Sequence, residues 1–275
     1  MIDLPYFDLL LEGRKRGDPA ARAFERYVHW GYWPDPGKAR RDEQDFLAAM
    51  DRLNNELLTA AEIRNGQSVL DAGCGFGGTI EAINKRHQSM SLFGLNIDPR
   101  QVEVAMKQVR PGYDNSIRFL VGDACAMPFQ GSSFHRVLAV ECIFHFPSRF
   151  QFLKEASRVL KPGGILVLSD FVPQFMGGGG AGWIQRMIGR GYGTTGSDWK
   201  EGDYRRMARE VRLELRADRD VTANTLPTYP MLLQLVRQSR LPQAAKMVWP
   251  TRLLWAVSAL RLVRYRILVF SKPNV

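Results

Sequence analysis

The stretch VLDAGCGFGG, residues 69–78, decides the fold of this chain. Its apolar start leads into Asp71, and four glycines follow between positions 73 and 78. Glycine is required where a backbone must turn tightly and approach a ligand closely. A strand that ends in an acid and continues into such a loop and a helix N-terminus is typical of a site for a nucleoside-bearing cofactor, at the carboxyl edge of a parallel sheet.

Around this stretch, short apolar segments alternate with segments of helical periodicity. The apolar segments are bounded by Gly, Asp or Pro and predict strands. The alternation predicts an α/β fold of the Rossmann-like, doubly wound type, with a mostly parallel seven-stranded sheet and helical cap insertions. The predicted strands are 68–72, 92–97, 117–122, 135–141, 164–171, 212–217 and 264–273, and the predicted helices include 38–62, 77–87, 99–110, 148–160 and 199–210.

The length of 275 residues suits one large domain with additions. We expect a single domain in three parts. Residues 1–62 form an N-terminal helical cap, residues 63–172 form the cofactor-binding core, and residues 173–275 add cap insertions and the last two strands. In the last part, the glycine-rich run at 177–183 predicts a flexible connection, and the Leu-, Trp- and Pro-rich segment at 222–260 predicts a cover over the substrate.

The composition is that of a globular protein. Hydrophobic content of 45% and charged content of 24% are ordinary for soluble domains. No stretch reaches the roughly 18 uninterrupted apolar residues of a membrane helix, and the first residues lack the apolar core of a secretory signal. Cys74, Cys125 and Cys142 have no metal-type spacing. We therefore expect reduced thiols, no bound metal and a cytoplasmic location.

The net charge of +10 is concentrated near the C-terminal end. Asp220 is the last acid, and eight basic residues follow it among Leu, Trp and Val. Such a segment suits a peripheral contact with an anionic membrane, a nucleic acid or an acidic substrate. The plainer alternative is a solvated helix face beside a core stripe. The high apolar content and the lack of a known nucleic-acid motif speak against nucleic acid.

Three observations oppose a nicotinamide cofactor, although the glycines also fit the fingerprint G-x-G-x-x-G. Asp71 stands where it would repel a pyrophosphate and attract a ligand with ammonium and sulfonium charges. The third strand leads into Asp123, which can accept a hydrogen bond from an adenine amino group, and into Ala124, which supplies a backbone N–H. The strand that ends in Asp170 is followed by a helix and two more predicted strands.

The order and spacing of these residues resemble the class I S-adenosylmethionine (SAM) methyltransferases. The similar branch contains the ubiquinone/menaquinone-biosynthesis methyltransferases, small-molecule O-methyltransferases that act on glycosides, and the tocopherol and sterol C-methyltransferases. The resemblance covers residues 65–172 and rests on VLDAGCGFGG, GLNIDP, VGDACAMPF, ECIFHFP and RVLKPGG. It implies the fold and the cofactor more specifically than the substrate.

The resemblance also implies which residues would hold SAM. The loop after the first strand would line its methionine part, and the end of the second strand would hold the ribose, where Asn96 stands in place of the acid of many relatives. The third strand would hold adenine, and the end of the fourth would lie under the cofactor. The residues implied are Asp71, Gly73, Gly75, Asn96, Ile97, Gln101, Asp123, Ala124, Glu141 and Cys142.

His145 is the first candidate for a catalytic base. A histidine side chain has an ordinary pKa of about 6.5, which suits proton removal near neutral pH. Similar glycoside O-methyltransferases pair a histidine here with an acid at the position of Asp170. The pattern of Glu141, His145 and Pro147 also resembles the C-methyltransferases, in which a carboxylate would stabilise or deprotonate a carbocation. The alternatives are packing or capping for His145, a plain strand-end acid for Asp170, and a surface arginine pair for Glu141.

A pocket for a hydrophobic acceptor is predicted from the apolar residues Trp183, Met187, Tyr192, Met231, Leu232, Trp249, Leu253 and Trp255. We therefore expect O-methylation of a hydrophobic small molecule in secondary metabolism, with C-methylation of an isoprenoid or aromatic ring as the nearest alternative. An RNA or protein methyltransferase, and a SAM-binding protein with another activity, are further alternatives.

Overall fold

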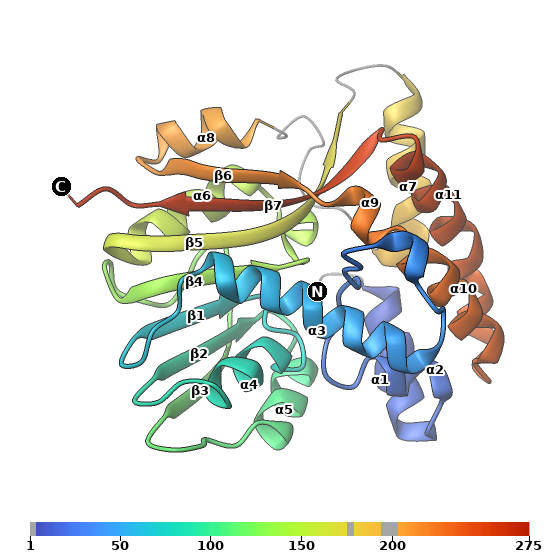
Figure 1. Ribbon diagram of the computed structural model, residues 1–275, viewed down its shortest axis with the longest axis horizontal. Helices are drawn as coiled ribbons and strands as arrows, with labels where there is room; N and C mark the ends of the chain where they lie inside the picture. The colour runs from blue at the N-terminus through green and yellow to red at the C-terminus, as the bar shows by residue number, and fades with distance from the viewer. Residues whose placement is uncertain (1–3, 175–178, 194–202, 275) are drawn as a thin grey trace.

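The computed structural model describes residues 4–174, 179–193 and 203–274. Seven strands form one sheet in the order β3-β2-β1-β4-β5-β7-β6 (Figure 1). The first five in this order run parallel, and β7 runs antiparallel to β5 and β6. The predicted fold class is therefore confirmed. The strands are β1 (Ser68–Ala72), β2 (Ser91–Asn96), β3 (Ser116–Val121), β4 (Phe134–Val140), β5 (Leu160–Pro173), β6 (Glu214–Asp220) and β7 (Val263–Ser271).

The central strands β1 and β4 are buried on both faces, to which successive side chains of a strand point in turn. On β1, Val69 packs into one hydrophobic core and Leu70 into another. The first core takes Leu53 from α3 and Ile80 from α4, and the second takes Phe152 from α6. The sheet is thus the middle layer of three. The helices flanking it are α3 (Glu43–Ala60), α4 (Gly78–Asn84), α5 (Pro99–Gln108), α6 (Arg149–Val159) and α8 (Tyr204–Glu210).

The remaining helices form a cap beyond the carboxyl ends of the parallel strands (Figure 1). Helices α1 and α2 contact each other, α10 contacts α2, and α7 lies along α11. In the described ranges, no helix has the length and apolar character needed to cross a membrane. The cap contains α1 (Pro5–Arg16), α2 (Pro19–Ala23), α7 (Gly179–Tyr192), α9 (Thr222–Thr225), α10 (Thr228–Gln238), the 3₁₀ helix η3 (Pro242–Met247) and α11 (Val248–Ala259).

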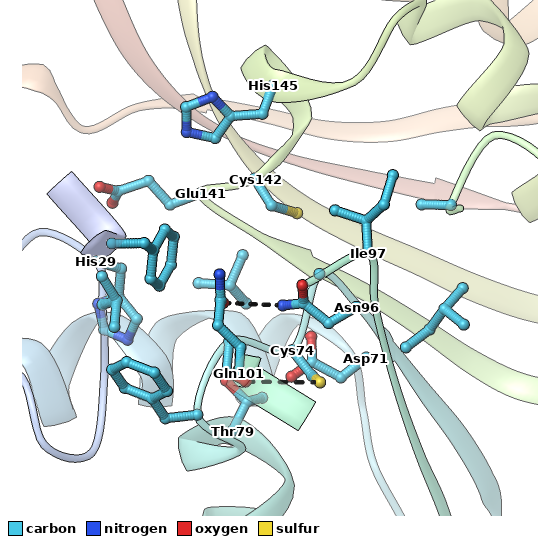
Figure 2. Close-up of a pocket in the computed structure, with 18 of the residues that line it drawn as sticks. His29, Asp71, Cys74, Thr79, Asn96, Ile97, Gln101, Glu141, Cys142 and His145 are labelled. Carbon is cyan, nitrogen blue, oxygen red and sulfur yellow. Dashed lines mark hydrogen bonds between the residues drawn. The ribbon is translucent and has the colours of Figure 1, made fainter. Parts of the chain in front are cut away.

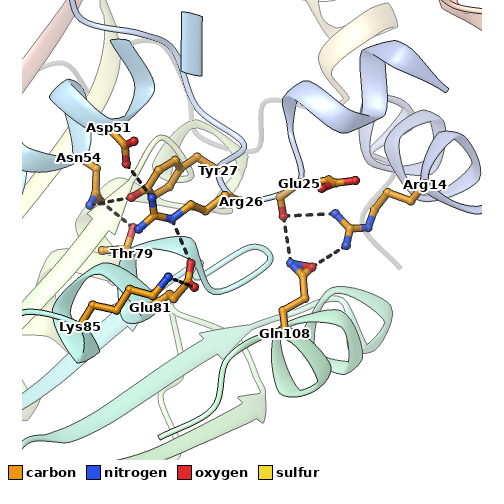
Figure 3. A network of polar contacts seen from close by, with 10 residues as sticks. All are labelled: Arg14, Glu25, Arg26, Tyr27, Asp51, Asn54, Thr79, Glu81, Lys85 and Gln108. Atoms are coloured by element: carbon orange, nitrogen blue, oxygen red, sulfur yellow. Dashed lines mark hydrogen bonds and ion pairs between the residues drawn. The ribbon is translucent and has the colours of Figure 1, made fainter. Parts of the chain in front are cut away.

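Polar contacts fasten the N-terminal segment to the core (Figure 3). The Arg26 guanidinium donates to Glu81 of α4 at 3.0 Å and to Asp51 of α3 at 2.9 Å. Arg14 donates to the side-chain oxygen of Gln108 on α5 at 2.5 Å. The N-terminal segment therefore contacts three helices of the core. It covers the edge of the sheet at which the parallel strands end.

Several boundaries differ from the sequence-based expectation. Helix α3 begins at Glu43, because the Asp42 side chain accepts the backbone N–H of Asp45 at 2.7 Å and caps the helix. The glycine-rich run was expected to be flexible, but from Gly179 onward it is the start of α7. Packing of α7 against α11 outweighs the low helix propensity of glycine there. The remainder of that run, at 177–178, and the start of the predicted helix, at 199–202, lie outside the described residues.

Candidate active site

A first cavity, which we name the strand-end cavity, lies at the carboxyl ends of β1, β2 and β4 (Figure 2). It contains about 860 Å³ of space including its mouth, and residues of the N-terminal segment complete its wall. The sequence-predicted residues that line it are Asp71, Gly73, Gly75, Asn96, Ile97, Gln101, Asp123, Ala124, Glu141, Cys142 and His145.

The glycine loop brings backbone close to this space. Gly73 has φ +90°, and a Cβ there would lie 2.6 Å from the sulfur of Cys142. Gly75 has φ +53°, and no protein atom lies within 4 Å of the position of its Cβ. A side chain at Gly73 is therefore excluded sterically, whereas the space beside Gly75 is open for a ligand.

Two buried hydrogen-bond acceptors of the strand-end cavity have no partner among the described residues. One is Oδ1 of Asp71, whose pKa is raised to about 7 by burial. The other is Nε2 of His29. Nδ1 of His29 lies 2.8 Å from the carbonyl of Trp30, so Nδ1 carries the proton and Nε2 is a bare acceptor. Burial lowers the pKa of His29 to about 4, which keeps the ring neutral. Buried acceptors left without a partner suit a ligand that brings its own donors.

Asn96 ends β2 and Asp123 follows β3, and both side chains form hydrogen bonds with nearby residues of the chain. The side-chain amide of Asn96 donates to Gln101 at 3.1 Å, and its oxygen accepts the backbone N–H of Asp98 at 3.0 Å. Asn96 is therefore held by the chain, and the Gln101 amide also interacts with the carboxylate of Asp98. Asp123 accepts the backbone N–H of Cys125 at 2.7 Å. No helix begins directly after Asp123, so this side chain does not cap a helix.

Glu141 follows β4 in a left-handed conformation with φ +51°, which is costly for a residue with a Cβ. Its Oε2 accepts the backbone N–H of Trp30 at 2.8 Å and the hydroxyl of Tyr265 at 2.7 Å. Burial raises its pKa to about 8, and the nearby Asp170 charge adds to that rise while the two donors oppose it. The alternative of a surface arginine partner is wrong, because the side chain is buried.

His145 lies in a short 3₁₀ turn after β4. One of its hydrogen-bond partners comes from the N-terminal helix α1. The hydroxyl of Tyr6, on α1, lies 3.1 Å from Nε2 of His145. The two rings stack with centroids 5.7 Å apart. Sequence reasoning did not single out Tyr6, since nothing in the pattern of α1 distinguishes this aromatic residue from those that only pack.

Asp170 forms its hydrogen bonds with other residues than Tyr6 and His145. It is fully buried on β5, and its Oδ2 accepts from Nε of Arg149 at 2.7 Å and from the hydroxyl of Tyr204 at 2.6 Å. It does not line the strand-end cavity. The predicted pairing of Asp170 with His145 is thus replaced by an ion pair with Arg149, because a buried carboxylate requires a nearby cation.

A second cavity, which we name the apolar cavity, adjoins the first. It contains about 720 Å³ including its mouth, and Tyr6, Val28 and Glu141 line both cavities. Of the hydrophobic residues predicted to form an acceptor pocket, Tyr192 and Leu232 line this cavity. Trp183, Trp249 and Trp255 are instead exposed. The residues that line the apolar cavity are Tyr6, Leu9, Leu10, Ala20, Phe24, Val28, Trp30, Glu141, Phe144, Tyr192, Leu232, Leu235, Val236, Ala244, Met247 and Thr251.

Comparison with known proteins identifies the family. The profile of the family described as "Methyltransferase domain" matches residues 70–168. Methyltransferase GfsG of Streptomyces halstedii is 33% identical over 215 residues, which cover 76% of this chain and 74% of that protein. This chain belongs to the class I SAM-dependent methyltransferases. The 27-O-demethylrifamycin SV methyltransferase of Amycolatopsis mediterranei is 31% identical over 205 residues, which cover 74% of this methyltransferase and 72% of that relative.

Solved structures share the fold of this methyltransferase. The [4+2]-cyclase SpnF superposes with a TM-score of 0.74 at 20% identity, over 100% of this chain and 99% of that one. Geranyl diphosphate C-methyltransferase from Streptomyces coelicolor superposes with a TM-score of 0.71 at 16% identity, over 96% and 97% of the two chains. Together with the sequence relatives, the family makes this protein a SAM-dependent enzyme that methylates small molecules.

Proposed function

We propose that this methyltransferase transfers a methyl group from SAM to an oxygen atom of a hydrophobic small molecule held in the apolar cavity. The observation that carries the proposal is that Tyr6, Val28 and Glu141 line both cavities, so a donor in one and an acceptor in the other would meet there. The lining residues come from residues 1–62, 63–172 and 173–275, which supports a single catalytic domain built from all three parts.

The strand-end cavity fits SAM. SAM, when bound, supplies a methyl group that its sulfonium sulfur has already activated. Asp71 and His29 offer bare acceptors for an ammonium group, and Gly75 leaves open space beside the backbone. The amide of Gln101 is suited to the ribose, and the loop at Asp123 to adenine. The remaining residues that we assign to cofactor binding are Gly73, Asn96, Ile97, Ala124, Glu141 and Cys142.

Methylation of a hydroxyl group releases one proton, which a base must accept. We assign this proton to Glu141, which lines both cavities and whose carboxylate form, populated as pH rises through its pKa of about 8, can accept it. A base is most effective when its pKa lies near the working pH. The Tyr6 hydroxyl, held against His145, positions the acceptor oxygen beside Glu141. Asp170 supports the site through Arg149 and does not touch the acceptor.

C-methylation is the second candidate, and the walls of the apolar cavity favour it specifically. Trp30, Phe144 and Tyr192 present aromatic rings there, and such rings attract a carbocation while Glu141 removes its proton. Nuclear magnetic resonance of the product made with methyl-labelled SAM separates the two reactions, because O-methyl and C-methyl carbons have different chemical shifts. Tight SAM binding without turnover on any acceptor would favour the third alternative, a SAM-binding protein with another activity.

A membrane surface is the partner that we assign to the basic C-terminal segment. Trp249 and Leu260 of the α11 region are each 70% exposed, and Arg252 and Arg261 lie beside them in sequence. Tryptophan and basic residues together are typical of peripheral membrane contacts. Co-sedimentation with anionic vesicles at low salt tests this, with neutral vesicles as the control. Absence of binding to anionic vesicles would contradict it.

The experiment that tests the proposed function is a calorimetric titration with SAM and with S-adenosylhomocysteine, followed by a screen of hydrophobic alcohols and phenols. We expect binding of both nucleosides and methyl transfer that Glu141→Gln reduces more than His145→Ala, because Glu141 is the base. Transfer that survives Glu141→Gln but is lost in His145→Ala would move the base to His145. Failure to bind either nucleoside would overturn the proposal.

A further inference from the structure

A groove runs over the surface between α1, α5, α7 and η3, outside the two cavities described above. Its floor is apolar and its rim is charged, with residues contributed by four elements that are distant in sequence. The apolar residues of the floor are Leu9, Leu11, Val104, Leu241 and Met247.

The acids of this groove are already matched by cations. Asp8 pairs with Arg100 at 2.7 Å, and Glu103 pairs with Lys107 at 2.5 Å. Glu12, the remaining acid, pairs with an arginine on its own helix at 2.5 Å. The carboxylates that line the groove are therefore neutralised by neighbours.

The other cations of the groove have no such match. Lys15 at the end of α1, Arg190 on α7 and Lys246 on η3 are exposed, and none has a carboxylate partner in the described ranges of the chain. Positive charge in excess on an apolar floor favours a ligand that is both apolar and anionic.

The groove adjoins the apolar cavity. Leu9 and Met247 line both of them, so only these two side chains need to separate for one molecule to occupy both. Helix α1 contacts both α7 and η3, which brings Lys15, Arg190 and Lys246 to the same end of the cap.

We infer that the acceptor is amphipathic, with a hydrophobic body in the apolar cavity and an anionic group, a carboxylate or a phosphate, held in the groove by Lys15, Arg190 and Lys246. This inference rests on the proposed function for the location of the acceptor, and it names the chemical class of that acceptor. The cations also direct the molecule, since the anionic end stays in the groove while the neutral end reaches Glu141.

Calorimetry with three simple probes tests the inference: decanoate, decyl phosphate and uncharged decanol, each below its micelle concentration, on the full chain saturated with S-adenosylhomocysteine. We expect the two anionic probes to bind about tenfold more tightly than decanol, because three exposed charge contacts contribute roughly 0.2–1 kcal/mol each. The preference should shrink between about 50 and about 500 mM salt, since exposed charges are screened.

Two matched triple variants locate the effect. Lys15→Gln, Arg190→Gln and Lys246→Gln together should remove the preference for anions and leave the affinity for decanol unchanged. The control removes the same charge from exposed positions outside the groove, Arg118→Gln, Lys154→Gln and Arg205→Gln, and should keep the preference.

Equal binding of decanoate and decanol to the native protein would overturn the inference, as would a preference that survives the groove variant or falls equally in the control. In each of these cases, methyl transfer to a neutral hydrophobic acceptor would leave the proposed function standing. Failure of all three probes to bind would instead remove the apolar cavity as the acceptor site, and both proposals with it.

Discussion

The hydroxyl of Tyr6 lies 3.1 Å from Nε2 of His145, although the two residues are 139 positions apart in the chain. Tyr6 is on the cap and His145 follows a central strand, so this contact exists only when α1 covers the sheet edge. Burial raises the pKa of Tyr6 well above its ordinary value, and the hydroxyl therefore remains protonated and able to form this hydrogen bond. The cap thus contributes chemistry to the site as well as covering it.

Replacing Tyr6 by Phe removes this hydroxyl and keeps the ring. We expect kcat to fall about tenfold, because a neutral hydrogen bond contributes roughly 0.5–1.5 kcal/mol, and SAM affinity to stay within about twofold. Steady-state kinetics and calorimetry measure the two quantities. Tyr113→Phe is the control, since that side chain is 69% exposed. An unchanged kcat, or a loss confined to SAM affinity, would contradict a positioning role.

Asp71 should make SAM binding depend on pH. Its pKa is about 7 when no cation is present, and a bound ammonium would lower it by favouring the carboxylate. Affinity is therefore expected to rise as pH rises through about 7, with a proton released on binding below that pH. Titrations in buffers of different ionisation enthalpy count the proton. Asp71→Asn should abolish the release and weaken binding, whereas Asp114→Asn, at an exposed carboxylate, should do neither.

Glu141 should make the stability of the free protein depend on pH. Its folded pKa of about 8 lies above the ordinary value of 4.5, so its contribution is fully favourable below pH 4.5 and is lost as pH rises through about 8. We expect Glu141→Gln to be relatively more stable than the native protein at about pH 9 than at about pH 5, by a few kcal/mol at most. Thermal unfolding across this range measures it. Parallel curves for the two proteins would refute the buried, protonated state.

At Gly78 the N-terminal segment lies close against the core. A Cβ at this position would lie 2.2 Å from the carbonyl oxygen of Arg26 and 2.7 Å from the ring of Tyr27. We expect Gly78→Ala to displace that segment and to weaken SAM binding at least about tenfold, with the sheet still folded by circular dichroism. Gly189→Ala is the control, because no atom lies within 4 Å of its Cβ position. Native affinity in Gly78→Ala would show that the segment can shift without cost.

Asp170→Asn should act on stability rather than on chemistry. The substitution leaves Arg149, which is 1% exposed, without its carboxylate. Removing one partner of a buried ion pair costs about 3–5 kcal/mol. We expect a large fall in the unfolding temperature, and near-native kcat per folded molecule at low temperature. A selective loss of kcat in a fully folded variant would return Asp170 to the catalytic group.

The part of the site that lies within one strand-loop-helix unit could be predicted from the sequence. Asp71, Gly73 and Gly75 are adjacent in the chain, and the chain neighbours of such a motif also become its spatial neighbours. The Tyr6 contact could not be predicted, because it depends on how a cap helix docks onto a distant strand. Asp170 was given the wrong partner for the same reason. The sequence predicts that Asp170 lies on a strand. The burial of Arg149 beside it depends on tertiary packing, which the sequence pattern does not show.

The ion pairs of Arg26 with Glu81 and Asp51 should affect the rate of turnover. These side chains are 25–43% exposed, so dissolved ions weaken their attraction, whereas the buried reaction centre is shielded from the same ions. Because residues of the N-terminal segment complete the wall of the strand-end cavity, we expect S-adenosylhomocysteine to leave when that segment lifts. Ionic strength is therefore expected to set how often the enzyme exchanges spent donor for fresh, independently of how fast it transfers each methyl group.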